Sequence, residues 1–397
     1  MTIESPLSSV RVIDCTQMMA GPFCTMLLGD MGADIIKIEK PDGDDIRRSG
    51  PPFIEGESAA FLGINRNKRS VVVNLKNDEG VSILRRMIEQ ADVLVQNMRP
   101  GTMDRLGLGY ETIQKINPAM IYTTISGFGI TGPYKNRGGF DLVAQGMSGL
   151  MSITGYPGGP PARNGVPIAD LNAGFYAAYG TLCAYIHRLQ TGKGQHVDTS
   201  LLEAGIAYSI WESAIYFATG KPPGPVGSGH SLSAPYQAFQ TKDSYFIVGA
   251  ANQANWERLC SAIGREELTQ DPRFTANSDR RHNLKELQIT LEKTFVKRTT
   301  LEWLKKLDEA GVPCGPINNL AEVYSDPQVK SRGMIVDMEH SKAGTIRNIG
   351  LPIKMSDTPG SIRKPAPVLG QHTAEVLAEF GYTQKEIALL KESRIIT

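Results

Sequence analysis

The sequence predicts an α/β protein with a large domain on a parallel β-sheet and a smaller α+β domain. Three observations lead to this fold class. Short apolar segments alternate with amphipathic helical segments over residues 10–125. A stretch rich in glycine and proline, residues 220–229, then interrupts the chain. The segments after it mix strand and helix patterns, which is typical of a second, smaller domain.

The elements of the large domain follow from apolar periodicity. Short apolar runs bounded by turn residues predict strands at Val10–Asp14, Ala33–Glu39, Ser70–Leu75, Ala91–Gln96 and Met120–Ile125. Helical periodicity predicts helices at Gly21–Met31, Glu79–Gln90, Tyr110–Ile116 and Leu171–Gln190. Because repeated βα units cover both faces of a parallel sheet, we expect a Rossmann-like domain. Its ligand should bind beyond the carboxyl ends of the strands. Neither GxGxxG after the first strand nor a Walker-type GxxxxGK motif occurs, which disfavours a dinucleotide or nucleoside triphosphate.

The smaller domain is expected after a break that follows the segment Trp211–Thr219. It contains a strand-like segment, Tyr245–Val248, as its first element. Helices are predicted at Asn255–Ile263, Leu284–Val296 and Leu301–Ala310, and an amphipathic helix near the end of the chain at Thr373–Phe380.

Composition narrows the functional class. The 397 residues include 42 basic and 41 acidic side chains, a balance that argues against nucleic acid or an anionic membrane as partner. Five cysteines lie scattered without a CxxC pair, and no leader or long apolar run is present, so we expect a cytoplasmic protein with reduced thiols. Six histidines form no HExxH motif and no GxSxG occurs, so neither a metal site nor a serine nucleophile is expected.

Asp170 is the candidate catalytic residue. It follows Asn164-Gly-Val-Pro-Ile-Ala169 at the start of the long helix, so its carboxylate should be partly desolvated. One interpretation is a helix N-cap, which the helix dipole favours. The other is a nucleophile: an aspartate of ordinary pKa, about 4, is ionised at neutral pH and attacks a thioester without a general base. Backbone N–H groups at the helix start would then stabilise the oxyanion.

A set of short motifs occurs in a fixed order along most of the chain. The pieces are Val12-Ile-Asp14, Ala20-Gly-Pro22, Gly32-Ala-Asp-Ile-Ile-Lys-Ile-Glu39, Asn67-Lys-Arg-Ser70, Asn97-Met-Arg-Pro-Gly-Thr-Met-Asp-Arg-Leu-Gly-Leu108, Ser126–Pro133, Asp170, Thr191-Gly-Lys-Gly-Gln195 and Gly370-Gln-His-Thr373. Each motif alone is weak, and the ordered set is specific. The set resembles one family, the class III CoA-transferases of the CaiB/BaiF type, which include formyl-CoA, carnitine and bile-acid CoA-transferases.

The resemblance implies that Asp170 forms an aspartyl anhydride and then an aspartyl-CoA thioester. CoA enters as a substrate, and no tightly bound cofactor is expected. The positions implied to contact CoA are Met19, Ala20, Lys40, Val73, Lys76, Asn97, Met98, Arg99 and Arg105, with Arg137 one residue from a further family contact. The lysines and arginines among them suit the three phosphate groups of CoA.

Two departures from the family's patterns refine the expected activity. Some relatives are 2-methylacyl-CoA racemases, which use a histidine where this chain has Phe140 and a glutamate where we align Asn252. Because neither residue here can move an α-proton, CoA transfer is favoured over racemisation. Formate- and oxalate-specific members carry a glycine run that closes over the site. Here the lid position reads Gly227-Ser-Gly-His230, so we expect acids other than formate and oxalate. The candidate substrate and lid contacts are Gly227, Gly229, His230 and Phe140.

The family fold implies a domain arrangement that periodicity cannot show. Members form homodimers whose chains interlock like linked rings, and the large domain contains both ends of the chain. We therefore expect a large CoA-binding domain at residues 1–222, a small domain at 223–330 and a returning segment at 331–397.

The leading hypothesis is transfer of CoA from an acyl-CoA, with succinyl-CoA preferred, to a small carboxylic or dicarboxylic acid. Two alternatives stay open. One is a racemase or epimerase with another acid–base pair, and the other is a CoA-binding protein without catalysis in which Asp170 is a helix cap.

Overall fold

The structure is a computed structural model that describes residues 5–397. It divides into two compact units. The large unit extends to Leu150 and comprises Arg163–Ala214 and Pro327–Thr397 as well, and the small unit comprises Met151–Ala162 and Ile215–Asp326. No pattern in the sequence indicates that Met151–Ala162 belongs with the small unit.

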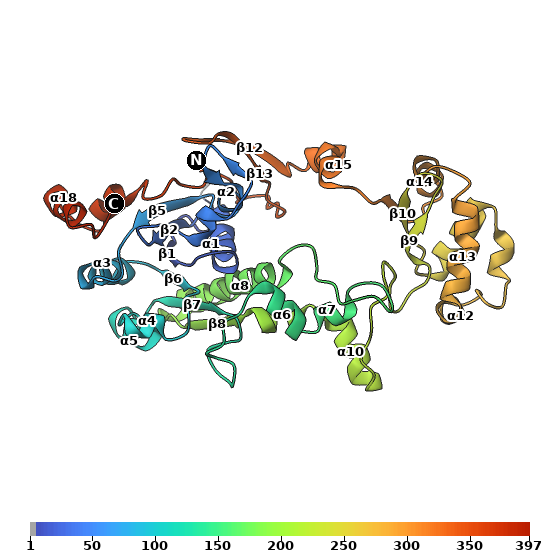
Figure 1. The fold of residues 1–397 in the computed structure, drawn as a ribbon, viewed down its shortest axis with the longest axis horizontal. Coiled ribbons are helices and arrows are strands. Elements are labelled where there is room, and N and C mark those ends of the chain that lie inside the picture. The colour runs from blue at the N-terminus through green and yellow to red at the C-terminus, as the bar shows by residue number, and fades with distance from the viewer. Residues whose placement is uncertain (1–4) are drawn as a thin grey trace. The chain divides into compact units, whose positions relative to one another are not determined.

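A six-stranded sheet forms the centre of the large unit in the described part of the chain (Figure 1). Its strand order is β5-β2-β1-β6-β7-β8, and every neighbouring pair is parallel. The parallel sheet predicted from the alternating segments is therefore confirmed. The strands are β1 Arg11–Cys15, β2 Asp34–Glu39, β5 Lys68–Val72, β6 Val93–Gln96, β7 Ile121–Ser126 and β8 His196–Ser200.

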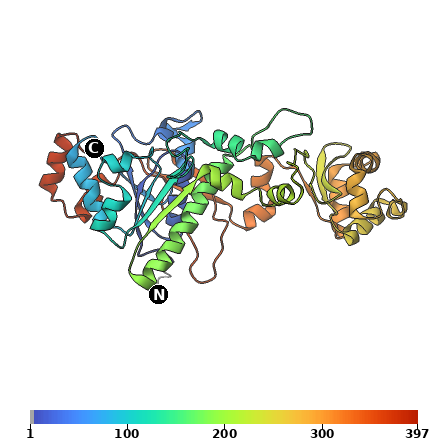
Figure 2. The ribbon, with the colours of Figure 1, turned by 90° about the horizontal axis from the view of Figure 1, so that it is seen from below.

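Helices cover both faces of this sheet (Figure 2). Because successive strand side chains point to opposite faces, Val12 and Val95 pack with α1 and α8, whereas Ile13 and Leu94 pack with α3 and the C-terminal helices. The helices of the N-terminal half are α1 Ala20–Asp30, η1 Asp45–Arg48, α2 Ala59–Ile64, α3 Asp78–Glu89, α4 Thr102–Arg105, α5 Tyr110–Ile116, α6 Asp141–Met147, α7 Leu150–Ile153, α8 Ile168–Thr191, α9 Leu201–Ala207 and α10 Ile210–Thr219. A short hairpin joins β3 Phe53–Ile54 to β4 Glu57–Ser58.

The small unit packs helices against an antiparallel sheet of order β11-β10-β9. Its first strand, β9, begins at Tyr236, so our expectation that Tyr245–Val248 is the first element was wrong. Trp256, Phe246 and Phe295 are fully buried in its core. The elements are β9 Tyr236–Gln240, β10 Tyr245–Gly249, α11 Gln253–Ile263, η2 Glu266–Thr269, α12 Asn277–His282, α13 Leu284–Phe295, α14 Thr300–Glu309, β11 Cys314–Pro316 and α15 Leu320–Ser325.

The C-terminal segment returns to the large unit, where α17 packs against β5. Arg69 on β5 pairs with Glu379 at the end of α17, Nη1 to Oε1, at 2.6 Å. At the end of the chain, Ile396 forms an antiparallel bridge with Val73. The elements here are α16 Pro327–Ser331, β12 Ile335–His340, β13 Gly344–Ile349, α17 Thr373–Glu379 and α18 Gln384–Glu392.

Strand β5 differs most from its predicted bounds. It begins at Lys68, two residues before the predicted start at Ser70, and ends at Val72. Charged residues normally argue against a buried strand, but Lys68 pairs with buried Asp14, and Arg69 pairs with Asp34. Their partners lie far away in sequence, so no local pattern indicated them. Across residues 5–397, none of the helices combines the length and apolarity that a membrane span requires.

Candidate active site

The site lies where the strand order of the main sheet changes direction. From β1 the chain proceeds outward to β2 and β5, and it then crosses to β6 on the other side of β1. The loops after β1 and β6 therefore meet at the carboxyl edge, where such sheets bind ligands. Asn97 joins the two loops: its Nδ2 donates to the carbonyl oxygen of Gln17 at 2.8 Å, and its Oδ1 accepts from the Gln17 N–H at 2.9 Å.

Buried charged side chains form hydrogen bonds to the backbone of the loop after β1. Lys37 Nζ donates to the carbonyl oxygen of Thr16 at 2.9 Å and to Asp44 Oδ2 at 2.8 Å. Asp44 Oδ1 in turn accepts from the N–H of Met18, whose φ of 67° lies in the left-handed region. Because that conformation is unfavourable for a residue with a side chain, these hydrogen bonds hold the loop in a shape it would not adopt alone.

A second buried pair adjoins the first. Lys68 Nζ lies 3.0 Å from Asp14 Oδ2, with both side chains fully buried. Burial opposes ionisation of Asp14, but Lys68 and Lys37 outweigh it and lower the pKa of Asp14. Burial lowers the pKa of Lys68 to about 8, against the opposing effect of Asp14. These groups are structural supports beneath the site.

Asp170 is the third residue of α8, not its N-cap. The N-cap position is Pro167, which has no capping side chain. The start of α8 is instead capped by Asp141, the first residue of α6. Its Oδ1 accepts from the N–H of Ala169 at 2.9 Å and from that of Asp170 at 3.4 Å. The interpretation of Asp170 as a plain N-cap was therefore wrong.

The N–H groups at the start of α8, which we expected to stabilise the oxyanion, already donate hydrogen bonds within the protein. Besides the two N–H groups bound by Asp141, the N–H of Ile168 donates to Val166 O and that of Leu171 to Pro167 O. The start of α8 thus has its donors occupied. The start of α1 is a better candidate, because its N-cap residue Met19 offers no side-chain cap and its first residue, Ala20, lines the cavity that contains Asp170.

Helices α1 and α8 approach closely beside Asp170. A Cβ atom on Gly174 would lie 2.5 Å from the carbonyl oxygen of Ala20, so only glycine permits this approach. Gly174 lies one turn after Asp170 on α8. The close crossing therefore places the start of α1 next to the carboxylate.

Burial raises the pKa of Asp170 to about 7, with a further contribution from the charge of Asp141. The pKa near 4 expected for an ordinary aspartate was wrong for this position. Asp170 is therefore only partly ionised at neutral pH, and its carboxylate is more basic than one in water. Such a perturbed group in a cavity is typical of a functional site.

Asp170 lines a cavity of about 420 Å³. Seven other residues singled out from the sequence line the same cavity: Met19, Ala20, Asn97, Met98, Arg99, Arg137 and Phe140. Phe140, where racemases have histidine, is 74% exposed. The structure thus gathers residues from four loops around one carboxylate.

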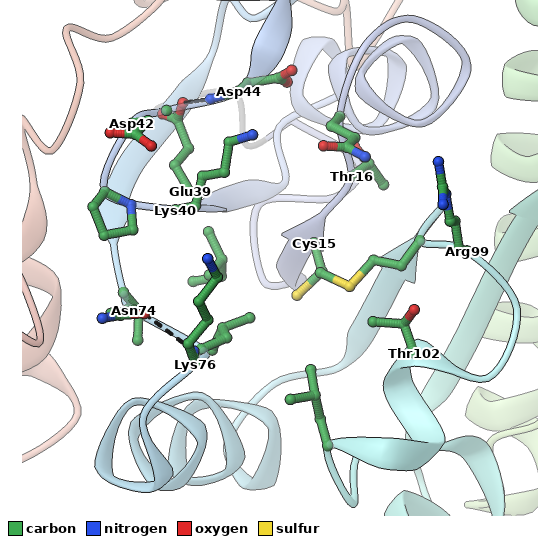
Figure 3. A pocket seen from close by; sticks show the side chains of 18 residues that line it. Cys15, Thr16, Glu39, Lys40, Asp42, Asp44, Asn74, Lys76, Arg99 and Thr102 are labelled. Carbon is green, nitrogen blue, oxygen red and sulfur yellow. Dashed lines mark hydrogen bonds between the residues drawn. The ribbon is translucent and has the colours of Figure 1, made fainter.

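A neighbouring cavity of about 600 Å³ shares Gln17, Met98 and Arg99 with the first. It contains the predicted CoA positions Lys40, Val73 and Lys76, and Figure 3 shows Lys40, Lys76 and Arg99 around it. Lys40 Nζ lies 2.7 Å from Asp45 Oδ1, and both side chains are about half exposed. Cationic side chains from three segments therefore surround one cleft.

Arg105 lies in a third cavity, of about 680 Å³, which also includes Met98 and Arg99. Its Nη2 donates to Thr102 Oγ1 at 3.0 Å. All the positions predicted to contact CoA thus line three adjoining cavities of the described chain, with Met98 and Arg99 common to all.

The candidate lid residues Gly227, Gly229 and His230 belong to the small unit. Within that unit the N–H of Gly227 donates to Gly155 O at 2.8 Å. His230 Nδ1 accepts from the N–H of Leu232 at 3.0 Å, and its ring lies edge-on to Tyr236. The loop is therefore held to the 151–162 segment.

Sequence reasoning missed three supporting residues: Asp141, Asp44 and Lys37. Asp141 is 29 residues from Asp170 and caps a helix other than its own, so no local pattern identifies it. Lys37 occurs in a quoted motif, but its burial beneath the loop depends on the sheet. No group of three or more metal-binding side chains occurs within residues 5–397.

Fold and cavities place the chain among α/β proteins with a ligand cleft at the switch point of a parallel sheet. Residues 7–373 match the model of CoA-transferase family III. The chain belongs to this family and is a CoA-transferase, as the ordered motifs predicted.

Two relatives and one solved structure illustrate the similarity. The chain is 41% identical over 393 residues to the Homo sapiens protein named succinyl-CoA:glutarate CoA-transferase, covering 98% of this chain and 90% of that one. It is 41% identical over 389 residues to succinate–glutarate CoA-transferase of Agrobacterium fabrum (strain C58), covering 95% and 96%. A crystal structure of a CAIB/BAIF family protein from Brucella suis superposes with a TM-score of 0.85 at 38% identity, covering 95% of this chain and 100% of that one.

Proposed function

We propose that the protein transfers CoA from an acyl-CoA, preferentially succinyl-CoA, to a small dicarboxylic acid such as glutarate, with Asp170 as nucleophile. The observation that supports this most is the buried carboxylate of Asp170 in a cavity that adjoins the cationic cleft of Lys40, Lys76 and Arg99. The substrates follow those named for the human and Agrobacterium relatives.

In the first half of the reaction, an Asp170 oxygen attacks the thioester carbonyl carbon. The C–S bond breaks, and CoA leaves as a thiolate, which yields a mixed anhydride. The thiolate then attacks the Asp170 carbonyl carbon of the anhydride. The donor acid leaves as a carboxylate, and Asp170 becomes an aspartyl-CoA thioester.

The second half repeats these steps with the acceptor. The acceptor carboxylate attacks the aspartyl thioester, releasing the CoA thiolate and forming a new anhydride. The thiolate attacks the acceptor's carbonyl carbon, which forms the product acyl-CoA and restores Asp170. No net proton is transferred, so the reaction needs an ionised Asp170 rather than a separate base.

The three cavities suit the parts of CoA. Its phosphate groups need cations, which Lys40, Lys76, Arg99 and Arg105 supply from three loops. The Asp170 cavity, with Met19, Ile125 and Phe140, suits the acyl group. The N–H groups at the start of α1 are the proposed oxyanion donors.

Trapping the covalent intermediate tests this function. Wild-type protein incubated with succinyl-CoA and hydroxylamine should gain one hydroxamate at Asp170, located by peptide mass spectrometry. Asp170→Asn should bind CoA and lose transfer by at least about 1,000-fold. The matched control is Asp357→Asn, an exposed carboxylate that lines none of the three cavities.

Three outcomes would contradict the proposal. Wild-type turnover by Asp170→Asn would exclude Asp170 as the nucleophile. Exchange of deuterium into the α-carbon of an acyl-CoA without an acceptor would indicate a racemase. Absence of both exchange and trapping with every donor would indicate a binding protein.

We also propose a homodimer. Helix α8 carries a row of exposed apolar side chains, Phe175, Tyr179, Ile186 and Leu189, of which Leu189 is 69% exposed. Their spacings of four, seven and three residues put them on one helix face, and an apolar face of this kind is typical of an interface. Light scattering coupled to size exclusion should give twice the chain mass, and a monomer at micromolar concentration would refute it.

A further inference from the structure

We propose that Arg137 binds the free carboxylate of the dicarboxylic acyl group and thereby selects dicarboxylic over monocarboxylic substrates. The inference rests on the proposed function and goes beyond it, since the resemblance implied a CoA contact near this position. It starts from one juxtaposition: Arg137 and Asp170 line the same cavity.

Arg137 is distinguished from the other cations by where it lies. Among the described residues that line the Asp170 cavity, the basic side chains are Arg99 and Arg137. Arg99 also lines both neighbouring cavities, which suits a contact along the length of CoA. Arg137 lines only the Asp170 cavity, so its position fits the end of the acyl group rather than the phosphates.

Aromatic rings hold the Arg137 guanidinium. Its Cζ lies 4.8 Å from the ring centroid of Tyr134 and 5.2 Å from that of Phe128. Cation–π contacts of this kind use no N–H donor, so the guanidinium N–H groups stay available as the fork that binds a carboxylate through two hydrogen bonds. Within residues 5–397, no ion pair to Arg137 is found.

Two glycines fix the backbone that carries Arg137. A Cβ atom on Gly139 would lie 2.5 Å from the Cα of Gly127, so the segment after Arg137 crosses the loop after β7 with no side chain between them. Both glycines line the Asp170 cavity. The crossing therefore keeps Arg137 at the cavity although its own loop is exposed.

The rest of the cavity favours a cation as the partner of a second substrate carboxylate. Its wall includes the apolar side chains of Met18, Ile125 and Leu201, which suit methylene groups. Its acidic residues, Asp170 and Asp45, would repel a second carboxylate. An arginine fork offsets this repulsion through two charge-assisted hydrogen bonds to the carboxylate.

Paired substrates separate this role from a CoA contact. Succinyl-CoA and butyryl-CoA have acyl chains of the same length, and only succinyl-CoA has the free carboxylate. Arg137→Gln should lower kcat/KM for succinyl-CoA by about 10- to 100-fold, as expected for a lost hydrogen-bonded charge pair, and change that for butyryl-CoA less than about threefold. Arg137→Lys should restore part of the loss.

Binding provides a second measurement that does not depend on turnover of butyryl-CoA. In the Asp170→Asn background, calorimetry gives Kd for succinyl-CoA and for free CoA. Adding Arg137→Gln should raise the Kd for succinyl-CoA by about 10-fold or more and leave the Kd for free CoA unchanged. Two variants are the controls. Arg99→Gln should weaken the binding of both ligands, and Arg85→Gln, on the exposed face of α3, should weaken the binding of neither.

An equal loss for succinyl-CoA and free CoA would overturn the inference and assign Arg137 to CoA. No change for either ligand would overturn it as well. Both results leave the proposed function intact, because that depends on trapping at Asp170 in the wild-type protein.

Discussion

Asp141 holds a negative charge next to Asp170 by capping the helix on which Asp170 lies. Its Oδ1 accepts from the N–H of Asp170 at 3.4 Å, and its Oδ2 accepts from Gln145 Nε2 at 2.7 Å. The second carboxylate is thus fixed by hydrogen bonds at a position where it raises the pKa of Asp170. One residue therefore stabilises the helix start and tunes the candidate nucleophile.

Asp141→Asn should move the acid limb of the pH profile of kcat/KM to lower pH. The amide oxygen can still accept from the backbone, while the charge that disfavours ionisation of Asp170 is gone. Since burial contributes more than Asp141 to the raised pKa, the move should be less than about one pH unit. Initial rates between pH 5 and 9 measure it, and an unchanged limb would show that Asp141 has no electrostatic role.

Asp170→Asn should stabilise the protein above neutral pH. The pKa of Asp170 is raised from 3.8 to about 7, so the folded protein retains a proton that the unfolded chain loses as the pH rises through this window. Stability therefore falls as the pH rises from 4 to 8, by an amount on the order of 3 kcal/mol. Urea unfolding at pH 5 and pH 8 gives the free energy of unfolding, which should be higher for the variant than for the wild type mainly at pH 8. An equal gain at both values would contradict the raised pKa.

Lys37→Met should destabilise the protein by about 3–5 kcal/mol, because it leaves the buried carboxylate of Asp44 without its cation. The matched control is Lys40→Met, whose pair with Asp45 is about half exposed and is worth less than about 1 kcal/mol. Denaturant unfolding gives both values. If the two variants lost equal stability, the buried network would not support the loop as described.

Removing residues 395–397 should raise KM for acyl-CoA by about 10-fold with little change in kcat. The carbonyl oxygen of Ile395 accepts from the N–H of Asn74 at 2.8 Å, and Ile396 bridges Val73. These bonds hold the segment that lines the cationic cleft, whereas Asp170 lies in the adjoining cavity. Steady-state kinetics against succinyl-CoA measure the change. Removing Thr397 alone is the control, and a loss confined to kcat would contradict a role in CoA binding.

The sequence by itself determined the class of fold and the identity of the family. Strands β1, β2, β6 and β7 were predicted to within two residues at either end, because apolar runs between turn residues report burial directly. The ordered motifs identified the family and singled out Asp170. Strand positions and family motifs can be found in the sequence because both depend on residues that are neighbours along the chain.

Tertiary structure alone decided how the site is supported and tuned. The charged residues Lys37 and Lys68 lie at 0% exposure, and only the sheet reveals the partners that make this possible. Asp141 caps the start of α8 from another helix, and burial in the folded protein, with the charge of Asp141, raises the pKa of Asp170. Electrostatic and packing effects act through space, so the pKa of Asp170 and the neighbours of Arg137 could be found only after the chain was folded.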